Sequence, residues 1–403
     1  MRTTICPGVT WVGVKDPELE IFDIVVPTEF GTTYNSYLIQ GEKATALIDT
    51  SKLNFSAEYF ANVETLTPLD KIDYVVVQHT EPDHAGCLLE LIRRHPNITV
   101  IHSKPCTKFI ENLVNCPFNS KPINNGDEID LGGKTLRFYV TPFLHWPDTM
   151  VSYLVEDQVL FSCDIMGSHF TSRSNDAIFN SELDPEDFGS SVASFKYYYS
   201  MIMRPYKEHI IKAFKLLDPL QKKVIATSHG PILDRDPSYY YDWYALQATN
   251  YLKRISSQKV TIIYASSYGN TVKMMEAVCA GLEDAGVELV AYDAATAPME
   301  AMIDSIELSA GVIFGTSTIN SKAPEPILSV IANLVVLNVV GRKAAVFGSY
   351  GWSGEGITMT EGICDVMHMK VVQEAFKVQM TPSAAQLDEG RQWGYQFGLK
   401  VIE

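Results

Sequence analysis

The chain has 403 residues, too many for one ordinary hydrophobic core, so we expect more than one domain. Hydrophobic residues make up 46% of the chain and charged residues 20%, as in folded globular proteins. The formal net charge of −16 argues against a nucleic-acid partner, because the chain would repel a phosphate backbone.

The N-terminus and the cysteines predict a cytoplasmic protein. The first residues, "MRTTICPGVTWVG", lack the basic region and apolar run of a signal peptide. The longest apolar stretch, "ILSVIANLVVLNVVG", is broken by asparagines and is too short to span a bilayer, so we expect no membrane contact. The 7 cysteines are scattered without a C-x-x-C pair, which argues against a zinc ribbon or a disulfide framework and fits reduced cytoplasm.

The first two-thirds of the chain is predicted to be rich in strands, with helices between them. The segments "YNSYLIQ" and "KATALIDT" are typical of a hairpin. Further strands are expected at "KIDYVVVQ", "NITVIHS", "KTLRFYVTPF", "MVSYLVEDQVLFSCD" and "KKVIATS".

From Val260 onward, strands alternate regularly with helices. The strand "KVTIIYAS" precedes a helix expected at residues 271–284, and "VELVAYDA", "AGVIFGTS" and "KAAVFGSY" are the next strands. Such alternation predicts a parallel sheet with helices on both faces. The pattern changes near residues 250–258, so we expect one domain at 1–253 and a second at 254–403.

The stretch "VVVQHTEPDHAG", residues 75–86, carries an unusual density of metal-binding groups. A run of valines typical of a buried strand is followed by His79, Glu81, Asp83 and His84 within seven residues of its end. Adjacent residues in an extended or turn segment point in different directions, so this cluster is better suited to two metal ions than to one.

Three other predicted strands also end at a potential ligand. His145 follows "LRFYVTPF" after one residue, Asp164 follows "QVLFSC", and His229 follows "KVIATS". Because strand ends on one edge of a sheet converge, we expect these residues to meet those that follow His79. Asp164 is the natural bridge between two metals, since each oxygen of a carboxylate can bind one ion. Imidazole and carboxylate ligands without thiolate suit iron, manganese or zinc.

The order of these residues resembles the metallo-β-lactamase fold, whose ligands begin with an H-x-[HED]-x-D-H motif at a strand end. The hydrolases of that fold usually have His at the third position of the motif and bind zinc, whereas this chain has Glu81. The sequence "HTEPDH", followed by His145, Asp164 and His229, is similar to that of the flavodiiron proteins, also called A-type flavoproteins. A carboxylate in place of an imidazole adds negative charge and favours oxidised iron.

The resemblance implies two non-haem irons and assigns their ligands. One iron would be bound by His79, Glu81, His145 and Asp164, and the other by Asp83, His84, His229 and the same Asp164. In the family a water sometimes takes the place of His84. We also expect His169 to lie near the site, and His95, His102, His209 and His368 to be surface or core residues.

The second domain contains three loops that resemble the FMN-binding loops of flavodoxin. "YASSYGNT" connects a strand to a helix, where backbone N–H groups and the helix dipole can hold a phosphate. "GTSTIN" and "GSYGWSGE" follow the next two strands, and Tyr350 and Trp352 offer aromatic surface to the flavin ring. The absence of G-x-G-x-x-G argues against a dinucleotide. The candidate contact residues are Ser266, Ser267, Tyr268, Gly269, Asn270, Thr271, Thr316, Ser317, Thr318, Ile319, Asn320, Ser349, Tyr350, Gly351, Trp352, Ser353 and Gly354.

The resemblance covers essentially the whole chain and implies both fold and function. It predicts a metallo-β-lactamase-like αββα sandwich followed by a flavodoxin-like doubly wound parallel sheet. It also implies an enzyme that reduces O2 to water, NO to N2O, or both, at a diiron site supplied with electrons through FMN. A head-to-tail homodimer is implied, with a separate electron donor such as rubredoxin or a reduced deazaflavin.

Two alternatives are a zinc-dependent hydrolase with a fused flavin domain and a non-catalytic flavin electron carrier. Glu81 argues against the first, and the full ligand set argues against the second.

Overall fold

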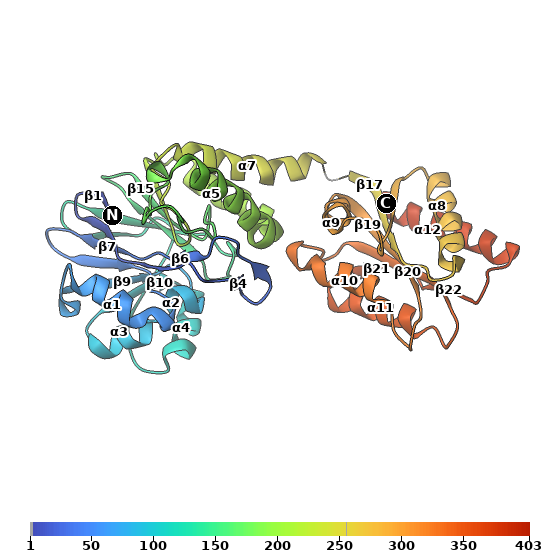
Figure 1. The fold of residues 1–403 in the computed structure, drawn as a ribbon, viewed down its shortest axis with the longest axis horizontal. Helices are drawn as coiled ribbons and strands as arrows, with labels where there is room; N and C mark the ends of the chain where they lie inside the picture. Colours follow the sequence, from blue (N-terminus) through green and yellow to red (C-terminus); the bar gives the residue numbers. More distant parts are fainter. Residues whose placement is uncertain (1–2, 255) are drawn as a thin grey trace. The chain divides into compact units, whose positions relative to one another are not determined.

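The computed structural model describes the backbone of residues 3–254 and 256–403, and it divides into two compact units (Figure 1). The units are Met1–Thr249 and Asn250–Glu403, and the division falls within helix α7 (Pro237–Arg254). The domain boundary expected after residue 253 lies near the end of this helix and stays a prediction. Among the described residues, no helix is both long and apolar enough to cross a membrane.

The first unit contains two large sheets. Within the described residues, one sheet has seven strands, of which β8 to β11 run parallel while β1, β2, β7 and β8 are antiparallel neighbours. The expected hairpin is confirmed, since Tyr37 pairs with Ile48 and Gln40 with Thr45. In order across the sheet, the strands are β1 (Thr4–Cys6), β2 (Val9–Trp11), β7 (Tyr37–Gln40), β8 (Thr45–Ile48), β9 (Tyr74–Val77), β10 (Thr99–Ser103) and β11 (Asn119–Ile123).

The other sheet of this unit has five strands among the described residues. β13 and β15 are both antiparallel to β14, and β15 is parallel to β16, so β13, β15 and β16 end at the same edge. Its strands are β12 (Glu128–Asp130), β13 (Thr135–Val140), β14 (Met150–Leu154), β15 (Val159–Cys163) and β16 (Val224–Thr227). Four short strands pair beside the sheets: β3 (Val14–Asp16) with β6 (Thr32–Tyr34), and β4 (Ile21–Phe22) with β5 (Val26–Pro27).

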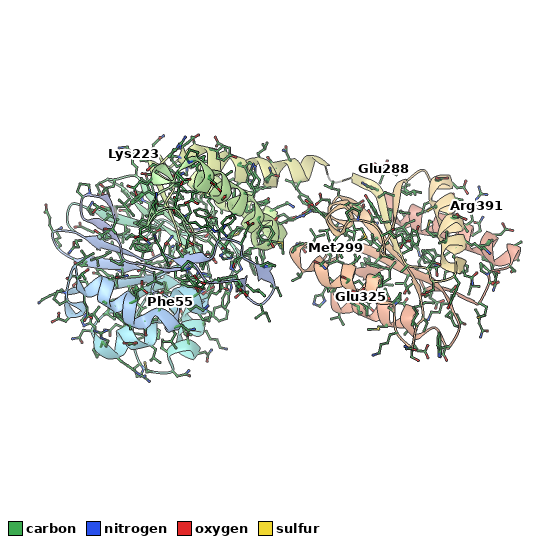
Figure 2. The ribbon with its side chains drawn as sticks, in the orientation of Figure 1. Phe55, Lys223, Glu288, Met299, Glu325 and Arg391 are labelled. Atoms are coloured by element: carbon green, nitrogen blue, oxygen red, sulfur yellow. The ribbon has the colours of Figure 1, made fainter. Side chains whose placement is uncertain are left out.

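Three apolar layers hold the sheets and helices of the first unit together. Figure 2 draws the side chains on the ribbon. Alternate residues of β9 point to opposite faces, so Val75 and Val77 pack against helices while Val76 packs against the second sheet. Residues such as Leu160 cover the outer face of the second sheet beneath further helices. The first group of helices is α1 (Ser56–Glu64), α3 (Leu88–Arg94) and α4 (Cys106–Val114), and the second is α5 (Pro185–Tyr198), α6 (Lys207–Leu217) and α7. The layers form the expected αββα sandwich.

Two details of the first unit differ from the sequence prediction. The strand expected to reach Phe143 ends at Val140, because Pro142 has no N–H to donate and Phe143 adopts a φ of 64°. The strand ends expected on one sheet edge belong to two sheets, with β9 in the seven-stranded sheet and the other three in the five-stranded sheet. The backbone joins the two sheets beside the candidate site, since Met150 N donates to Gln78 O at 2.8 Å.

The second unit is a parallel sheet with helices on both faces. Its order β18-β17-β19-β20 places the first strand between the second and third, as in flavodoxin-like sheets. The strands are β17 (Ser256–Tyr264), β18 (Glu288–Asp293), β19 (Ser309–Ser317), β20 (Lys343–Tyr350), β21 (Lys370–Val371) and β22 (Phe376–Gln379). The helices are α8 (Asn270–Asp284), α9 (Met299–Glu307), α10 (Glu325–Asn333), α11 (Glu355–Val366) and α12 (Ala384–Ile402). The doubly wound fold is confirmed.

Candidate metal centre

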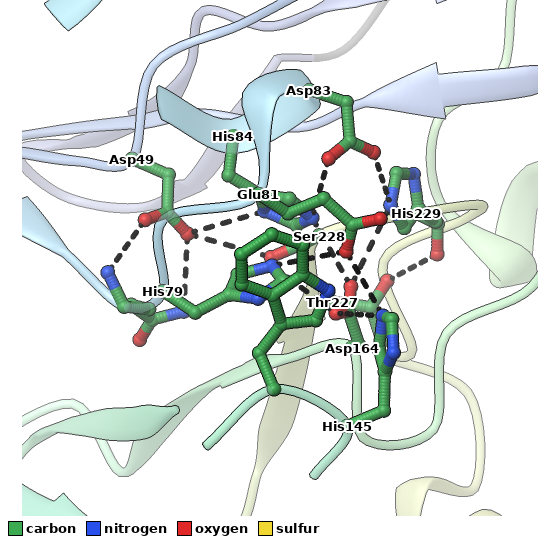
Figure 3. A network of polar contacts seen from close by, with 12 residues as sticks. Asp49, His79, Glu81, Asp83, His84, His145, Asp164, Thr227, Ser228 and His229 are labelled. Carbon is green, nitrogen blue, oxygen red and sulfur yellow. Dashed lines mark hydrogen bonds and ion pairs between the residues drawn. The ribbon is translucent and has the colours of Figure 1, made fainter. Parts of the chain in front are cut away.

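The polar residues that follow four strands meet at the edge where the two sheets of the first unit face each other (Figure 3). His79 follows β9 after one residue, Asp164 follows β15 directly, and His229 follows β16 after one residue. His145 lies in the loop after β13. Because both sheets contribute, the cluster depends on the packing of the sandwich and not on one sheet alone.

The segment after His79 contains a short helix that the sequence analysis did not predict. Pro82 begins a short helix, α2 (Pro82–Ala85), since its fixed φ suits the first helical position. The helix turn separates the Asp83 side chain from Glu81, and Asp83 and His84 both point into the cluster (Figure 3). Asp148 fixes Thr80, the residue before Glu81, because Asp148 Oδ2 accepts from Thr80 N at 3.0 Å and from Thr80 Oγ1 at 2.7 Å.

One group of donor atoms gathers around Asp164 Oδ2. His79 Nε2 lies 3.2 Å from this oxygen and His145 Nε2 lies 3.4 Å from it. Glu81 Oε2 completes the group at 2.9 Å from His145 Nε2 and 3.9 Å from His79 Nε2. These are the four residues that the family pattern assigns to one iron.

A second group gathers around Asp164 Oδ1. His84 Nε2 lies 3.3 Å from this oxygen and His229 Nε2 lies 3.5 Å from it. Asp83 approaches from the other side, with Oδ2 3.1 Å from His229 Nε2 and Oδ1 3.5 Å from His84 Nε2. Asp164 therefore turns one oxygen to each group, which is the geometry of a carboxylate that bridges two metal ions.

Most donor atoms of the two groups fit metal ions because they are buried without hydrogen bonds. Both nitrogens of His79, Nε2 of His84, Oε2 of Glu81 and both carboxylate oxygens of Asp83 and Asp164 have no hydrogen-bond partner among the described residues. Several imidazole nitrogens lie closer than 3.3 Å to a carboxylate oxygen, yet these atoms are not aligned as hydrogen bonds. Buried polar atoms left in this state are costly unless a ligand satisfies them.

The charges of the cluster also suit cations. Burial raises the pKa of Glu81 to about 7, since a buried carboxylate without a cation is costly to ionise. Burial lowers the pKa of His79 well below its usual range, and the nearby His84 lowers it further, so its imidazole is neutral and able to bind a metal. Burial opposes ionisation of Asp164 as well, but the neighbouring His84 outweighs it and holds the pKa of Asp164 well below the usual value.

Most of the residues predicted to contact a flavin in the second unit line one pocket at the carboxyl ends of β17, β19 and β20. The pocket has a volume of 350 Å³. Helix α8 points its N-terminus to it after Gly269, whose φ of 81° is readily adopted by glycine. Predicted residues that line it are Ser266, Ser267, Tyr268, Asn270, Thr271, Ser317, Thr318, Ile319, Ser349, Tyr350, Gly351 and Trp352.

Five predicted contact residues are not part of the lining. Thr316 is fully buried within β19, and its Oγ1 donates to Ser317 O at 2.9 Å. The others are Gly269, Asn320, Ser353 and Gly354. Met380, just after β22, lines the pocket and was missed, because the sequence prediction considered only the loops after three strands.

Comparison with known proteins places both units in one family. A family model described as ODP family beta lactamase matches residues 32–230, and a flavodoxin model matches residues 262–394. The type A flavoprotein FprA of Rhodobacter capsulatus is 36% identical over 97% of this chain and 89% of its own length. The chain belongs to the type A flavoproteins, the flavodiiron family.

Other members of the flavodiiron family are similar along nearly the whole chain. The anaerobic nitric oxide reductase flavorubredoxin of Aliivibrio salmonicida is 33% identical over 97% of this chain and 76% of its own length. The solved structure of rubredoxin oxygen:oxidoreductase from the anaerobe Desulfovibrio gigas matches with a TM-score of 0.71 and 26% identity, covering 99% of this chain and 98% of that one.

Several residues that support the candidate flavodiiron centre were not identified from the sequence. Thr33 O accepts from His229 Nδ1 at 2.6 Å, which leaves Nε2 of His229 free to face the cluster. Thr32 Oγ1 lies 2.9 Å from His169 Nδ1, and the His169 ring centroid is 5.3 Å from that of His229, so His169 lies beside the site as expected. Thr32 and Thr33 carry no signal in the sequence, since hydroxyl residues are common in strands.

Asp49 and Cys163 also lie at the centre and were missed. Asp49 is buried and its Oδ2 is 3.8 Å from His84 Nδ1. It directly follows the apolar run of β8, so the strand-end criterion that selected His79 and Asp164 also selects Asp49. The Cys163 thiol lies within 4.8 Å of donor atoms of His79, His84 and Asp164, and burial raises its pKa well above the usual value, which keeps it protonated.

Proposed function

We propose that this chain is an oxidoreductase that reduces O2 to water, NO to N2O, or both, at a pair of non-haem irons, with electrons relayed through FMN. Family membership supports this function, as do the names of two relatives, a nitric oxide reductase and a rubredoxin oxygen:oxidoreductase. The observation that carries the proposal is the placement of Asp164 between two buried groups of unpartnered nitrogen and oxygen atoms.

The proposed ligands follow from the two groups of contacts. His79, Glu81 and His145 would hold one iron, with Asp164 Oδ2. The other iron would be held, with Asp164 Oδ1, by Asp83, His84 and His229. Three carboxylates offset part of the charge of the two ions, and the imidazole and carboxylate ligands of these two groups suit iron.

When bound, the iron pair supplies reducing electrons and open coordination positions to a diatomic gas, and FMN restores those electrons. The chain itself fixes the ligands and excludes water. His79 and Asp164 are fully buried, whereas the side chain of His145 is 14% exposed, so the accessible side of the centre lies at His145. Thr33 O accepts a hydrogen bond from His229 Nδ1 and so orients this imidazole. The other ring nitrogen, Nε2, faces the cluster and stays free for a metal.

The pocket of the second unit would hold FMN. We propose that the loop at residues 266–271 and the N-terminus of α8 bind the phosphate through backbone N–H groups. Tyr350 and Trp352 would flank the flavin ring, and the 59% exposure of Trp352 leaves its indole available for such a contact. The remaining predicted contacts, including Thr316 and Asn320, stay predictions.

A homodimer in which the flavin of one chain serves the iron pair of the other is part of the proposal. The flavin pocket is rimmed by exposed apolar side chains, with Tyr268 94% and Met380 63% exposed. The hairpin of β4 and β5 in the first unit exposes Ile24 by 93%. Apolar side chains this exposed are typical of surfaces that contact another protein. A cytoplasmic location and a separate donor, rubredoxin or a reduced deazaflavin, complete the proposal.

The test begins with iron and FMN content of the purified protein. The protein is then reduced anaerobically and mixed separately with O2 or NO, while flavin reoxidation and the product N2O are followed. We expect rapid reoxidation with at least one gas and formation of its product. Comparable slow reoxidation with both gases and no product would refute the proposal. A preparation that contains zinc and hydrolyses esters or lactams would instead support the zinc-hydrolase alternative.

An Asp83→Ala variant distinguishes an enzyme from a non-catalytic flavin electron carrier. Asp83 lies in the first unit, so we expect its loss to abolish gas reduction while FMN is still reduced by an added donor. If gas reduction persists at the wild-type rate, the metal cluster is not the site of reaction.

A further inference from the structure

Asp49 lies on the far side of the His84 imidazole from the metal cluster (Figure 3). The two ring nitrogens of His84 face different carboxylates. Nε2 lies 3.3 Å from Asp164 Oδ1 and 3.5 Å from Asp83 Oδ1, whereas Nδ1 lies 3.8 Å from Asp49 Oδ2. The separation from Asp49 is longer than a hydrogen bond, so the interaction in this geometry is electrostatic.

The Asp49 carboxylate is itself fixed from both sheets. Gln78, which follows β9, donates through its backbone N to Asp49 Oδ1 at 2.8 Å and through Nε2 to Oδ2 at 3.3 Å. Ser228, which follows β16, donates from Oγ to Oδ2 at 3.5 Å. Because Asp49 is 1% exposed, water does not screen its charge from the neighbouring imidazole.

The residue after Asp49 fixes the main chain of His84. Thr50 donates from both N, at 2.8 Å, and Oγ1, at 2.6 Å, to the carbonyl oxygen of His84. The His84 ring is also confined laterally, with its centroid 4.1 Å from that of His79 and 5.0 Å from that of His229. The position of the imidazole is therefore determined, and its remaining freedom is which nitrogen carries the proton.

We propose that Asp49 is a positioning residue that keeps the proton of His84 on Nδ1, so that Nε2 binds the iron held by Asp83 and His229 in place of a water. A negative charge beside Nδ1 favours the tautomer with N–H at that atom and leaves the lone pair of Nε2 directed at Asp83 and Asp164. This inference rests on the proposed diiron function and names the residue that selects the coordination of one iron.

The test compares ferrous ion binding by the full-length wild type and an Asp49→Asn variant. Asp49 has a φ of 55°, a conformation that Asn also adopts readily, and the amide preserves the size of the side chain while removing its charge. Under anaerobic chelator competition, we expect about 10–100-fold weaker binding of one iron and unchanged binding of the other. If the variant binds each of the two irons as tightly as the wild type does, the proposal is overturned.

A double-mutant comparison shows whether Asp49 acts through His84. We expect Asp49→Asn to have no effect on iron affinity when His84 is already replaced by Ala, because the residue it positions is gone. An equal loss in both backgrounds would contradict the proposal. Asp187→Asn is the matched control, since Asp187 is another buried carboxylate that accepts hydrogen bonds from residues 172–174. If Asp187→Asn weakens iron binding as much as Asp49→Asn does, the effect is general destabilisation.

A measurement on wild-type protein does not depend on how the variants fold. In Zn²⁺-loaded protein, ¹⁵N NMR of the histidine side chains reads which nitrogen is protonated and which binds metal. We expect His84 to be protonated at Nδ1 and bound through Nε2, and a His84 that is free of metal or bound through Nδ1 would overturn the inference. Failure of wild-type protein to reduce O2 or NO would instead refute the proposed function. The metal-binding results would still test the role of Asp49.

Discussion

Asp164 is the residue on which both groups of the metal centre depend. Its two oxygens face different sets of imidazoles, and its side chain is fully buried. The sequence alone predicted this role from its position at a strand end and from the two oxygens of a carboxylate. Asp49 satisfied the same positional criterion, but its contact with His84 depends on β8 and β9 being neighbours in one sheet and on the helical turn of α2, which strand patterns do not reveal.

Replacing Asp164 by Asn removes one negative charge and one metal-binding oxygen. We expect Asp164→Asn to lose at least one of the two irons while FMN content is unchanged, because the flavin pocket is lined by residues of the other unit. Metal analysis and flavin absorbance of the purified variant measure both quantities. Asp73→Asn is a suitable control, since Asp73 accepts from Thr45 N at the surface, and two irons retained in Asp164→Asn would contradict the bridging role.

Glu81 distinguishes this centre from that of the zinc hydrolases. Its Oε2 lies 2.9 Å from His145 Nε2 within the first donor group. We expect Glu81→His to shift metal selection from iron toward zinc, because an imidazole removes a negative charge and a hard oxygen ligand. The measurement is the iron-to-zinc ratio after reconstitution of metal-free protein with equal amounts of both ions. A ratio equal to that of the wild type would show that Glu81 does not set the preference.

At the scale of elements, strands were easier to predict than the turns that follow them. Runs of β-branched and aromatic residues identified β9, β13, β15 and β16, since such runs suit buried strands. Helix α2 was missed because four residues are too few to give a periodic pattern, although Pro82 is a signal for a helix start. The pairing of strands into two sheets was also missed, because apolar runs do not specify which strands become neighbours.

Helices α8 and α12 of the second unit pack closely against each other at Gly281. A Cβ added at Gly281 would lie 1.8 Å from Arg391 O, so Ala there requires the helices to separate. We expect Gly281→Ala to lower the free energy of unfolding of this unit by about 1–3 kcal/mol and to weaken FMN binding, since α8 begins at the flavin pocket. Thermal unfolding and flavin titration measure the two effects.

Gly362 provides a matched control for this substitution. It lies within α11, and a Cβ added to it would meet no atom within 4 Å. Gly362→Ala should therefore raise the free energy of unfolding by about 0.5–1 kcal/mol. If both substitutions have the same effect, close helix packing is not what Gly281 provides.

At the scale of the whole molecule, the chain joins two units with different chemistry. The metal cluster belongs to the first unit, and the three flavin loops belong to the second. The change from a strand-rich composition to a regular alternation of strands and helices predicted this division. Each of these two patterns reflects how helices cover the sheet of one unit. Contacts between chains depend on surfaces, and a pattern of buried residues contains little information about those.

The predicted boundary after residue 253 can be tested by producing the units separately. Each unit has its own apolar core, so we expect residues 1–253 to bind iron without flavin and residues 254–403 to bind FMN without iron. Metal analysis, flavin absorbance and thermal unfolding of each piece measure the outcome. Insoluble or unfolded pieces, with an intact full-length chain, would show that the units do not fold independently.

If Asp164 bridges two irons, the ions lie close enough for their unpaired electrons to couple, so magnetic coupling is the measurement that tests the bridge. Mössbauer and EPR spectra of the iron-loaded, oxidised protein report whether two ferric ions interact. We predict two irons per chain that are antiferromagnetically coupled, so that the fully loaded oxidised protein has a diamagnetic ground state. Spectra of isolated high-spin ferric ions in fully loaded protein would show that Asp164 does not bridge the two irons.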